Sequence, residues 1–292
     1  MKQQKSPLLR GAAYIAGVFT ALTVWQNTHI ITTEYKIRSI HLPTAFEGFR
    51  IAVLADIHSR NFGEAQKQVL DRVREAMPDL IVVAGDWLDA KRGHIEYCIT
   101  QAAGLTEIAP VYAVYGNHEL SRIRQTDRDC FSPALERAGV HLLHSCGTQI
   151  ERGGMFINLL GIEDPTEGTD RQLRGTEIAQ ALDGMLHRVM TGILPDEFTI
   201  LLAHRPEFLL HYAKYPINLI CAGHAHGGQV RLPGLGGLFA PGQGLFPKYT
   251  GGAYTEGQTT MVVSRGLGGQ EAPIRILNTP ELVMLELHTE MG

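Results

Sequence analysis

Five short clusters of carboxylate, amide and imidazole side chains each follow a run of apolar residues, although the clusters are far apart in the chain. Oxygen and imidazole groups are the ligands that hard or borderline divalent metals such as Mn, Fe and Zn prefer, and no cysteine stands among them. Short apolar runs are typical of buried strands, which can bring the residues that follow them to one edge of a sheet. A site of this kind suits phosphoester hydrolysis with two divalent ions. The candidate metal ligands are Asp56, His58, Asp86, Asn117, His204, His224 and His226.

The spacing within the clusters has a physical rationale. In an extended chain, residues two apart point to the same side, so Asp56 and His58 can both reach one ion, as can His224 and His226. A carboxylate has two oxygens and can bridge two ions.

The order of the clusters resembles the calcineurin-like metallophosphoesterase superfamily, whose pattern is D-x-H, G-D, G-N-H-[DE], H and G-H-x-H. The resemblance extends over about residues 50–286. GHAHGGQVRLP (223–233) and SRGLG (264–268) are similar to its bacterial branch of YaeI/YkuE-type phosphodiesterases. The matching stretches are LADIH (54–58), VAGDW (83–87), YGNHE (115–119), LLAHR (201–205) and AGHAH (222–226).

The resemblance implies two metal ions that share the Asp86 carboxylate and a bridging hydroxide, which attacks phosphorus in line. It implies that His118 is the general acid, or the stabiliser of charge on the leaving oxygen. Glu119 is either a partner that orients His118 or part of a salt bridge elsewhere. The implied ligands are Asp56, His58, Asp86 and His226 for the first ion, and Asp86, Asn117, His204 and His224 for the second.

Three further residues are candidates near these clusters. Asp89 either supports the site from behind the ligands or serves a loop or helix start. Arg60 and Arg265 are candidate substrate-binding residues, because a guanidinium group binds phosphate oxygens through two parallel hydrogen bonds.

Alternating strand-like and helix-like segments predict an α/β fold. The superfamily resemblance sharpens this expectation to a four-layer α/β/β/α sandwich of two mixed sheets flanked by helices, with the metals at the strand ends. Predicted strands cover 50–55, 80–84, 111–115, 155–162, 199–203, 217–222, 229–232, 259–264 and 281–287. Predicted helices cover 64–77, 94–107, 132–138, 172–190 and 206–212.

Composition fits one folded catalytic unit. The 292 residues are 44% hydrophobic and 19% charged, and the net charge is −4. We find no basic stripe with interleaved aromatic residues, so nucleic acid is not an expected partner. The four cysteines form no C-x-x-C pair, which disfavours a structural zinc site.

The N-terminus predicts a membrane segment. Lys2, Lys5 and Arg10 precede an uncharged run over 11–33. We favour an uncleaved signal anchor over 1–33, ahead of a cleaved signal and a surface helix, followed by a catalytic domain over 34–292. The basic N-terminal side predicts a single-pass protein of the bacterial inner membrane with its catalytic domain on the outer face.

A glycine- and proline-rich segment, 233–252, follows the last histidine pair and carries several large apolar residues. Long loops of this kind are often functional, and this one could line a groove for a lipid tail or touch a bilayer. The alternative is that its side chains fold back onto the protein's own core.

Three function classes remain open. The leading one is a phosphodiesterase or pyrophosphatase that acts on a lipid-linked substrate such as UDP-2,3-diacylglucosamine, a substrate taken from the resemblance and the anchor. The second is a phosphomonoesterase, including a protein phosphatase. Against it, the Asp-Arg-Gly of those phosphatases is interrupted here in WLDAKRG (87–93). The third is a non-catalytic scaffold of the same fold.

Overall fold

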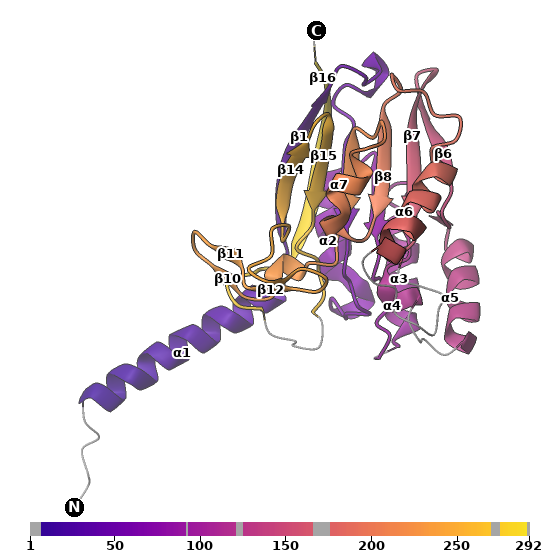
Figure 1. Cartoon of the computed structure of the whole chain (residues 1–292). Helices are drawn as coiled ribbons and strands as arrows, with labels where there is room; N and C mark the ends of the chain where they lie inside the picture. Colours follow the sequence, from indigo (N-terminus) through magenta and orange to yellow (C-terminus); the bar gives the residue numbers. More distant parts are fainter. Residues whose placement is uncertain (1–6, 92, 121–124, 166–175, 270–274, 291–292) are drawn as a thin grey trace, which may run out of the picture.

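The computed structural model describes residues 7–91, 93–120, 125–165, 176–269 and 275–290. Two mixed six-stranded sheets lie face to face (Figure 1). In the first sheet, in spatial order, are β1 (Ile31–Ser39), β16 (Glu281–Thr289), β2 (Arg50–Leu54), β3 (Leu80–Ala84), β4 (Val111–Val114) and β5 (Val140–Leu142). In the second are β14 (Gly252–Glu256), β15 (Thr259–Val263), β9 (Leu219–Ala222), β8 (Thr199–Ala203), β7 (Met155–Ile162) and β6 (Gly147–Arg152).

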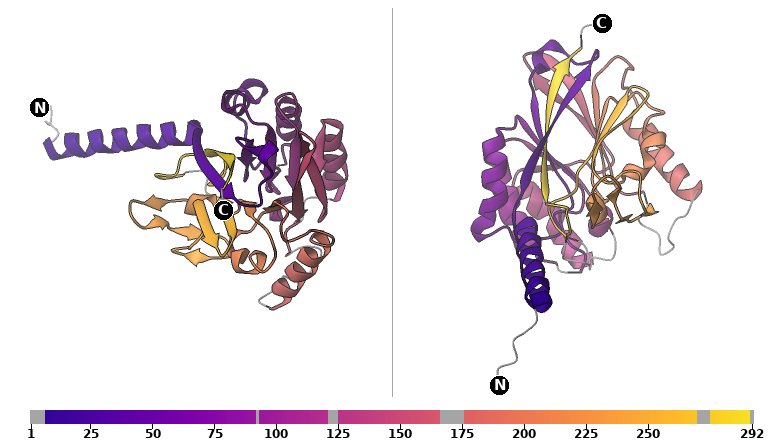
Figure 2. Two further views of the ribbon diagram at one scale, coloured as in Figure 1. Left: turned by 90° about the horizontal axis from the view of Figure 1, so that it is seen from above. Right: turned by 90° about the vertical axis from the view of Figure 1, so that its left-hand side faces the viewer.

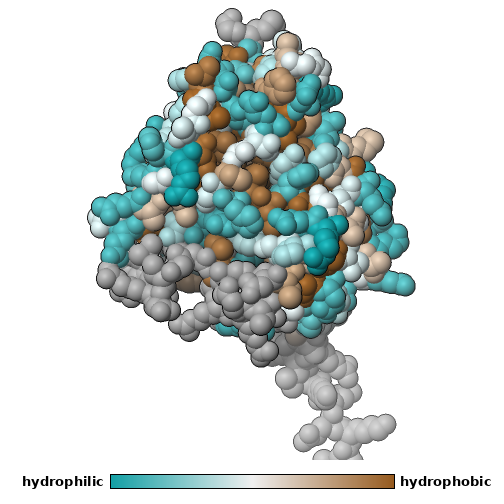
Figure 3. Space-filling model, turned by 90° about the vertical axis from the view of Figure 1, so that its right-hand side faces the viewer, coloured by the Kyte–Doolittle hydropathy of each residue, from teal (hydrophilic) through white to brown (hydrophobic). Residues whose placement is uncertain are grey.

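Strand residues alternate between two apolar layers. Ile51 and Val53 of β2 point into the core between the sheets, whereas Ala52 and Leu54 point to the outer face. Both faces of the central strands are therefore buried, which explains why they are continuous apolar runs in the sequence. Figure 3 shows the edge opposite α1, where hydrophilic side chains flank a central band of apolar ones.

Helices cover both outer faces and confirm an α/β fold with two mixed sheets. The first sheet packs on α2 (Lys67–Ala76), α3 (Ile95–Thr106) and α5 (Gln125–Arg137). The second packs on α6 (Thr176–Val189) and α7 (Leu209–Tyr212). Five further helical segments of three or four residues lie in the loops: α4 (Asn117–Leu120), η1 (Thr44–Phe46), η2 (Glu64–Gln66), η3 (Pro206–Phe208) and η4 (His226–Gly228).

The N-terminal segment differs from the predicted anchor. It forms α1 (Pro7–Thr28), which projects from the sandwich (Figures 1 and 2). Within the described ranges, no helix combines the length and the apolar character that a membrane span needs. The anchor helix predicted over 1–33 is thus not found among the described residues.

The predicted boundary between residues 33 and 34 lies inside β1, which pairs in parallel with β16 from Ile31 onward. A form that begins at residue 34 would lose the first three residues of this edge strand. The segment after the last histidine pair forms two small hairpins, made of β10 (Arg231–Leu232) with β11 (Gly236–Gly237) and β12 (Phe239–Ala240) with β13 (Gly244–Leu245).

Candidate metal centre

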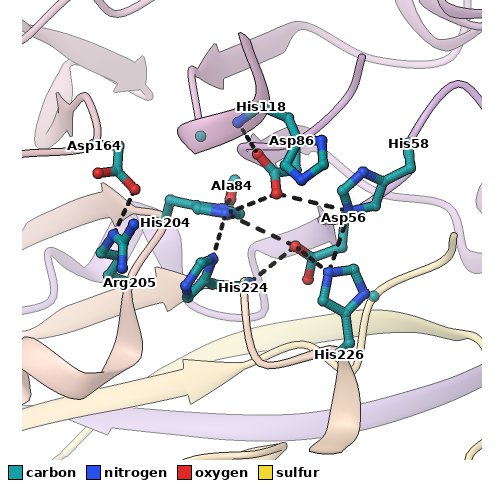
Figure 4. Close-up of polar contacts among 12 residues, drawn as sticks. Asp56, His58, Ala84, Asp86, His118, Asp164, His204, Arg205, His224 and His226 are labelled. Carbon is teal, nitrogen blue, oxygen red and sulfur yellow. Dashed lines mark hydrogen bonds and ion pairs between the residues drawn. The ribbon is translucent and has the colours of Figure 1, made fainter. Parts of the chain in front are cut away.

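The predicted ligands gather at the carboxyl ends of five strands from both sheets. Asp56 and His58 follow β2, Asp86 follows β3, and Asn117 follows β4. From the second sheet, His204 follows β8, and His224 and His226 follow β9. Parallel strands end at the same edge, so residues more than a hundred positions apart meet there (Figure 4).

The local conformation of the ligands differs from the extended chain assumed above. Asp56, His58, Asp86, His224 and His226 all have positive φ, between 48° and 66°. The pairs converge through left-handed turns after the strands and not through strand alternation. Such conformations carry strain in non-glycine residues and cluster at functional sites, where the surroundings hold them in place.

Six of the seven predicted ligands fall into two overlapping groups that could each hold an ion, and Asn117 is in neither. In each group the atoms lie within 4.8 Å of one another, and Asp86 is the only member of both. Asn117 lies next to His118, whose backbone N–H donates to Asp86 Oδ1 at 2.9 Å. The first group is Asp56, His58, Asp86 and His226; the second is Asp86, His204 and His224.

Asp86 lies between the two groups. Its Oδ2 atom is 3.1 Å from His204 Nε2 and 3.7 Å from His58 Nε2. Within each group, two imidazole nitrogens face each other at 3.2 Å, in the pairs His58–His226 and His204–His224. Two nitrogen atoms that each bind the same ion at about 2.1 Å stand roughly 3 Å apart. The nitrogen–nitrogen separations of 3.2 Å therefore fit pairs of imidazoles that bind one cation together.

Backbone contacts orient the second group. His204 Nδ1 donates to the carbonyl of Ala84 at 2.7 Å, so Nε2 is the nitrogen that can bind a metal once the imidazole is neutral. The glycines of the motifs are needed for close approach. A Cβ on Gly85 would lie 2.5 Å from His204 Nδ1, and one on Gly116 would lie 2.3 Å from Asp86 Oδ1.

Burial and mutual charge set the protonation of the metal-free centre. Burial raises the pKa of Asp56 to about 6, against the opposing charge of His204. Burial also acts upward on Asp86, but the imidazoles of His204, His118 and His58 outweigh it and hold the pKa of Asp86 well below its usual range. For His204 burial acts downward, yet the two carboxylates outweigh it and raise its pKa to about 10.

Several buried polar atoms of the centre lack a hydrogen-bond partner among the described residues, and they indicate whether cations fit there. Asp56 Oδ2, Asn117 Oδ1 and His224 Nε2 are buried and have no hydrogen-bond partner among the described residues. Buried polar atoms without partners are rare and costly in folded proteins. Cations bound between them would satisfy these lone pairs, so the donor set fits a two-metal centre, as the sequence predicted.

Metal uptake by this centre is expected to release about one proton or more at neutral pH, because ligands bind metals in their deprotonated form. The raised pKa of His204 means that its imidazole is protonated in the metal-free protein and must lose that proton. Affinity for Mn²⁺ should therefore rise with pH. Calorimetric titration in two buffers of different ionisation enthalpy measures the release, and equal heats in both buffers would contradict it.

His118 lies beside the centre and points its ring at that of His58, with the ring centroids 4.4 Å apart. Its Nδ1 accepts a hydrogen bond from the backbone N–H of Ala90 at 3.3 Å. The ring proton of neutral His118 is therefore on Nε2. Burial is the main cause that lowers the pKa of His118.

Glu119 holds the loops that carry the ligands. Its carboxylate accepts backbone hydrogen bonds from Asp86 at 3.1 Å, Gly116 at 2.8 Å and Leu88 at 2.8 Å. These contacts orient the Asp86 loop, which is neither of the two roles left open for Glu119. Burial, and then the charge of Asp86, raise the pKa of Glu119 to about 7.

Replacing Glu119 by glutamine is expected to weaken metal affinity by about 10–100-fold, because the amide nitrogen cannot accept from a backbone N–H. Metal titration of the purified variant measures this. Glu47→Gln is the matched control, since Glu47 accepts bonds from Thr289 at the other end of the strands. Equal loss in both variants would indicate general destabilisation.

The remaining candidates make structural contacts. Asp89 Oδ2 lies 3.4 Å from His58 Nδ1 and supports that ligand from behind. Arg60 donates to the carbonyls of Leu267, at 2.9 Å, and of Asn27. Arg265 pairs with Glu281 at 2.8 Å. The substrate-binding role of the two arginines stays a prediction.

Sequence reasoning missed one buried side chain next to the centre. Arg275 is fully buried and donates to the carbonyls of Gly268 and Arg265. The backbone N–H of Gly268 donates in turn to the carbonyl of Asp56 at 2.6 Å. Arg275 therefore braces the loop that carries Asp56. It stands in no motif, and only the SRGLG match pointed to its partners.

The chain is similar in sequence to known proteins. A sequence profile of calcineurin-like phosphoesterases matches residues 49–228. The uncharacterized metallophosphoesterase YkuE of Bacillus subtilis is 31% identical over 98% of both chains, and phosphodiesterase YaeI of Escherichia coli is 29% identical over 82% of both. The solved structure of a phosphopantetheinyl hydrolase from Mycobacterium tuberculosis covers 75% of this chain and 89% of its own, with a TM-score of 0.46 and 14% identity.

The matched segment contains all five motif clusters together with the strands that place them at one edge of the sandwich. The resemblance noted in the sequence is thereby confirmed, and the chain belongs to the calcineurin-like phosphoesterase family.

Proposed function

We propose that this protein is a metal-dependent phosphodiesterase with a two-metal centre. The proposal is carried by the buried carboxylate, amide and imidazole atoms that converge without hydrogen-bond partners among the described residues. When bound, divalent ions supply an activated water and stabilise charge on phosphate oxygens.

The protein's own residues hold this chemistry in place. Ala84 fixes the tautomer of His204, and Glu119 fixes the loop of Asp86. His118 is bound by its backbone to Asp86 and carries its ring proton on Nε2. It is thus placed to protonate or stabilise a leaving oxygen at the edge of the centre.

Two observations support a diester over a monoester. The relative YaeI bears the name phosphodiesterase. In addition, the Asp-Arg-Gly run of protein phosphatases is interrupted here, and Trp87 and Leu88, which follow Asp86, are buried side chains without charge. A lipid-linked diester, the substrate class expected from the sequence, remains part of the proposal.

The test is hydrolysis of bis-p-nitrophenyl phosphate and p-nitrophenyl phosphate by the full chain. The full chain is needed because β1 begins at Ile31. Protein stripped of metal is titrated with Mn²⁺, Fe²⁺ or Zn²⁺, and we expect restored cleavage of the diester. Cleavage of the monoester alone would assign a phosphomonoesterase, and a folded protein that takes up no metal would assign a scaffold.

A further inference from the structure

Exposed apolar side chains are concentrated on one part of the molecule. Of the seventeen large hydrophobic residues that are exposed in the described chain, eleven lie on α1, on the hairpin segment 232–246 or at Leu277. Solvent-exposed apolar patches of this extent mark interaction sites. We call the following residues the apolar surface: Tyr14, Val18, Leu22, Trp25, Leu232, Leu235, Leu245, Phe246 and Leu277.

The helical part of this surface is one face of α1, and Val24, the fifth exposed large apolar residue described on the helix, lies off that face. Its residues are spaced four, four and three apart, from Tyr14 to Trp25, which places them on one side of a helix. Their exposed fractions range from 42% at Val18 to 75% at Tyr14. The side chains are too exposed to belong to the protein's own core.

Contacts join α1 to the hairpin segment. Leu277 donates its backbone N–H to Gln26 of α1 at 3.0 Å, and Asn27 bonds both the N–H and the carbonyl of Arg275. The neighbouring Ile276 forms a bridge with Val230, which leads directly into β10. Helix and hairpins accordingly lie on the same side of the molecule in both views (Figures 1 and 2).

The charge of the two segments is opposite to that of the whole chain. Neither 1–33 nor 228–255 contains an acidic residue, although the chain has a net charge of −4. Their charged residues are all basic: Lys2, Lys5, Arg10, Arg231 and Lys248. Lys248 is exposed two positions after the exposed Phe246, and Trp25 and Tyr14 are the aromatic types that favour a membrane interface.

We propose that the apolar surface docks on an anionic lipid bilayer and lies within its headgroup region without crossing it. Apolar side chains enter the acyl boundary, while lysine and arginine pair with lipid phosphates. A second copy of the chain is a poorer fit, because two such surfaces would bring their basic groups together.

Docking would place the candidate centre close to the lipid. His226 and Gly228 immediately precede the hairpins, and Gly228 touches Gly237 of β11. Asn278, next to Leu277, donates to the carbonyl of His226 at 2.7 Å. A phosphoester held in the bilayer would thus be presented beside the metal ligands, but the docking itself does not depend on the proposed reaction.

The test is flotation of the full chain, without added metal, on vesicles of phosphatidylcholine or of equal parts phosphatidylcholine and phosphatidylglycerol. We expect preferential binding to the anionic vesicles. The double variant Leu235→Ser, Phe246→Ser should bind at least about tenfold more weakly, since each side chain buries apolar area in the lipid. Lys248→Gln should lose about fivefold on anionic vesicles.

Phe156→Ser is the matched control, because Phe156 is 48% exposed on β7, in the other part of the fold. It should bind like the parent protein. Equal loss in the control, equal binding to both vesicle types, or a change of oligomeric state in the double variant without vesicles would each overturn the proposal. Diester cleavage in solution, which the surface variants should retain, reports separately on the proposed function.

Tryptophan fluorescence provides an independent test of the docking. Trp87 is buried, whereas Trp25 is 50% exposed. Anionic vesicles should therefore shift the tryptophan emission to shorter wavelength, and Trp25→Phe should abolish the shift. A shift that persists in this variant would contradict docking through α1.

Discussion

Replacing Asp86 by asparagine is expected to lower kcat/KM for a phosphodiester by about a thousandfold or more, which corresponds to the several kcal/mol that a metal centre supplies. Asp86 is the one residue common to both ligand groups. The amide carries no negative charge, so it would hold two cations far more weakly than the carboxylate. Metal content should fall together with activity, and elemental analysis of the purified variant measures it.

Asparagine is the right replacement because Asp86 has a φ of 54°. Asn tolerates this left-handed conformation, whereas alanine would add backbone strain to the loss of the ligand. Asp89→Asn is the matched control, since Asp89 is a buried carboxylate that contacts the ligand His58 and stands in neither ligand group. It should cost about 10–100-fold, as supporting residues do. A variant at Asp86 that keeps full metal content and rate would refute the two-metal reading.

Apolar runs predicted the central strands well. The predicted strands 80–84, 155–162 and 199–203 have the bounds of β3, β7 and β8. β1 was not predicted from the sequence. Its alternating polar and apolar residues directly follow an uncharged run, and its partner strand, β16, lies some 250 residues away in the chain. Pairings at such separation follow from the packing of the whole sandwich and leave no local signal.

More of the candidate site than of the loops around it could be predicted from the sequence. The side chains that converge at the centre were predicted from the motif clusters, since each cluster directly follows a strand. The left-handed turns that make them converge, and the support from Glu119 and Arg275, depend on loops that meet only in the folded chain. A buried arginine that bonds carbonyls looks like any loop arginine in the sequence.

Replacing His118 by alanine or by glutamine is expected to slow hydrolysis of diesters with alkyl leaving groups by about 10²–10⁴-fold, the usual contribution of a proton donor. Cleavage of bis-p-nitrophenyl phosphate should fall far less, because p-nitrophenolate leaves without a proton. Metal content should be unchanged, since His118 contacts Asp86 through its backbone N–H, which both variants keep. Rates on a series of leaving groups measure the effect.

The pH dependence distinguishes a proton donor from a hydrogen-bond donor at this position. Burial is the main cause that holds the pKa of His118 below its usual range, so its acid form is depleted as pH rises through that pKa. For alkyl leaving groups the rate of the parent protein should therefore fall with rising pH, and His118→Gln should lose this fall together with the rate. If glutamine instead restored most of the rate lost in alanine, hydrogen bonding and not proton transfer would be the role of His118, because an amide donates a hydrogen bond but yields no proton.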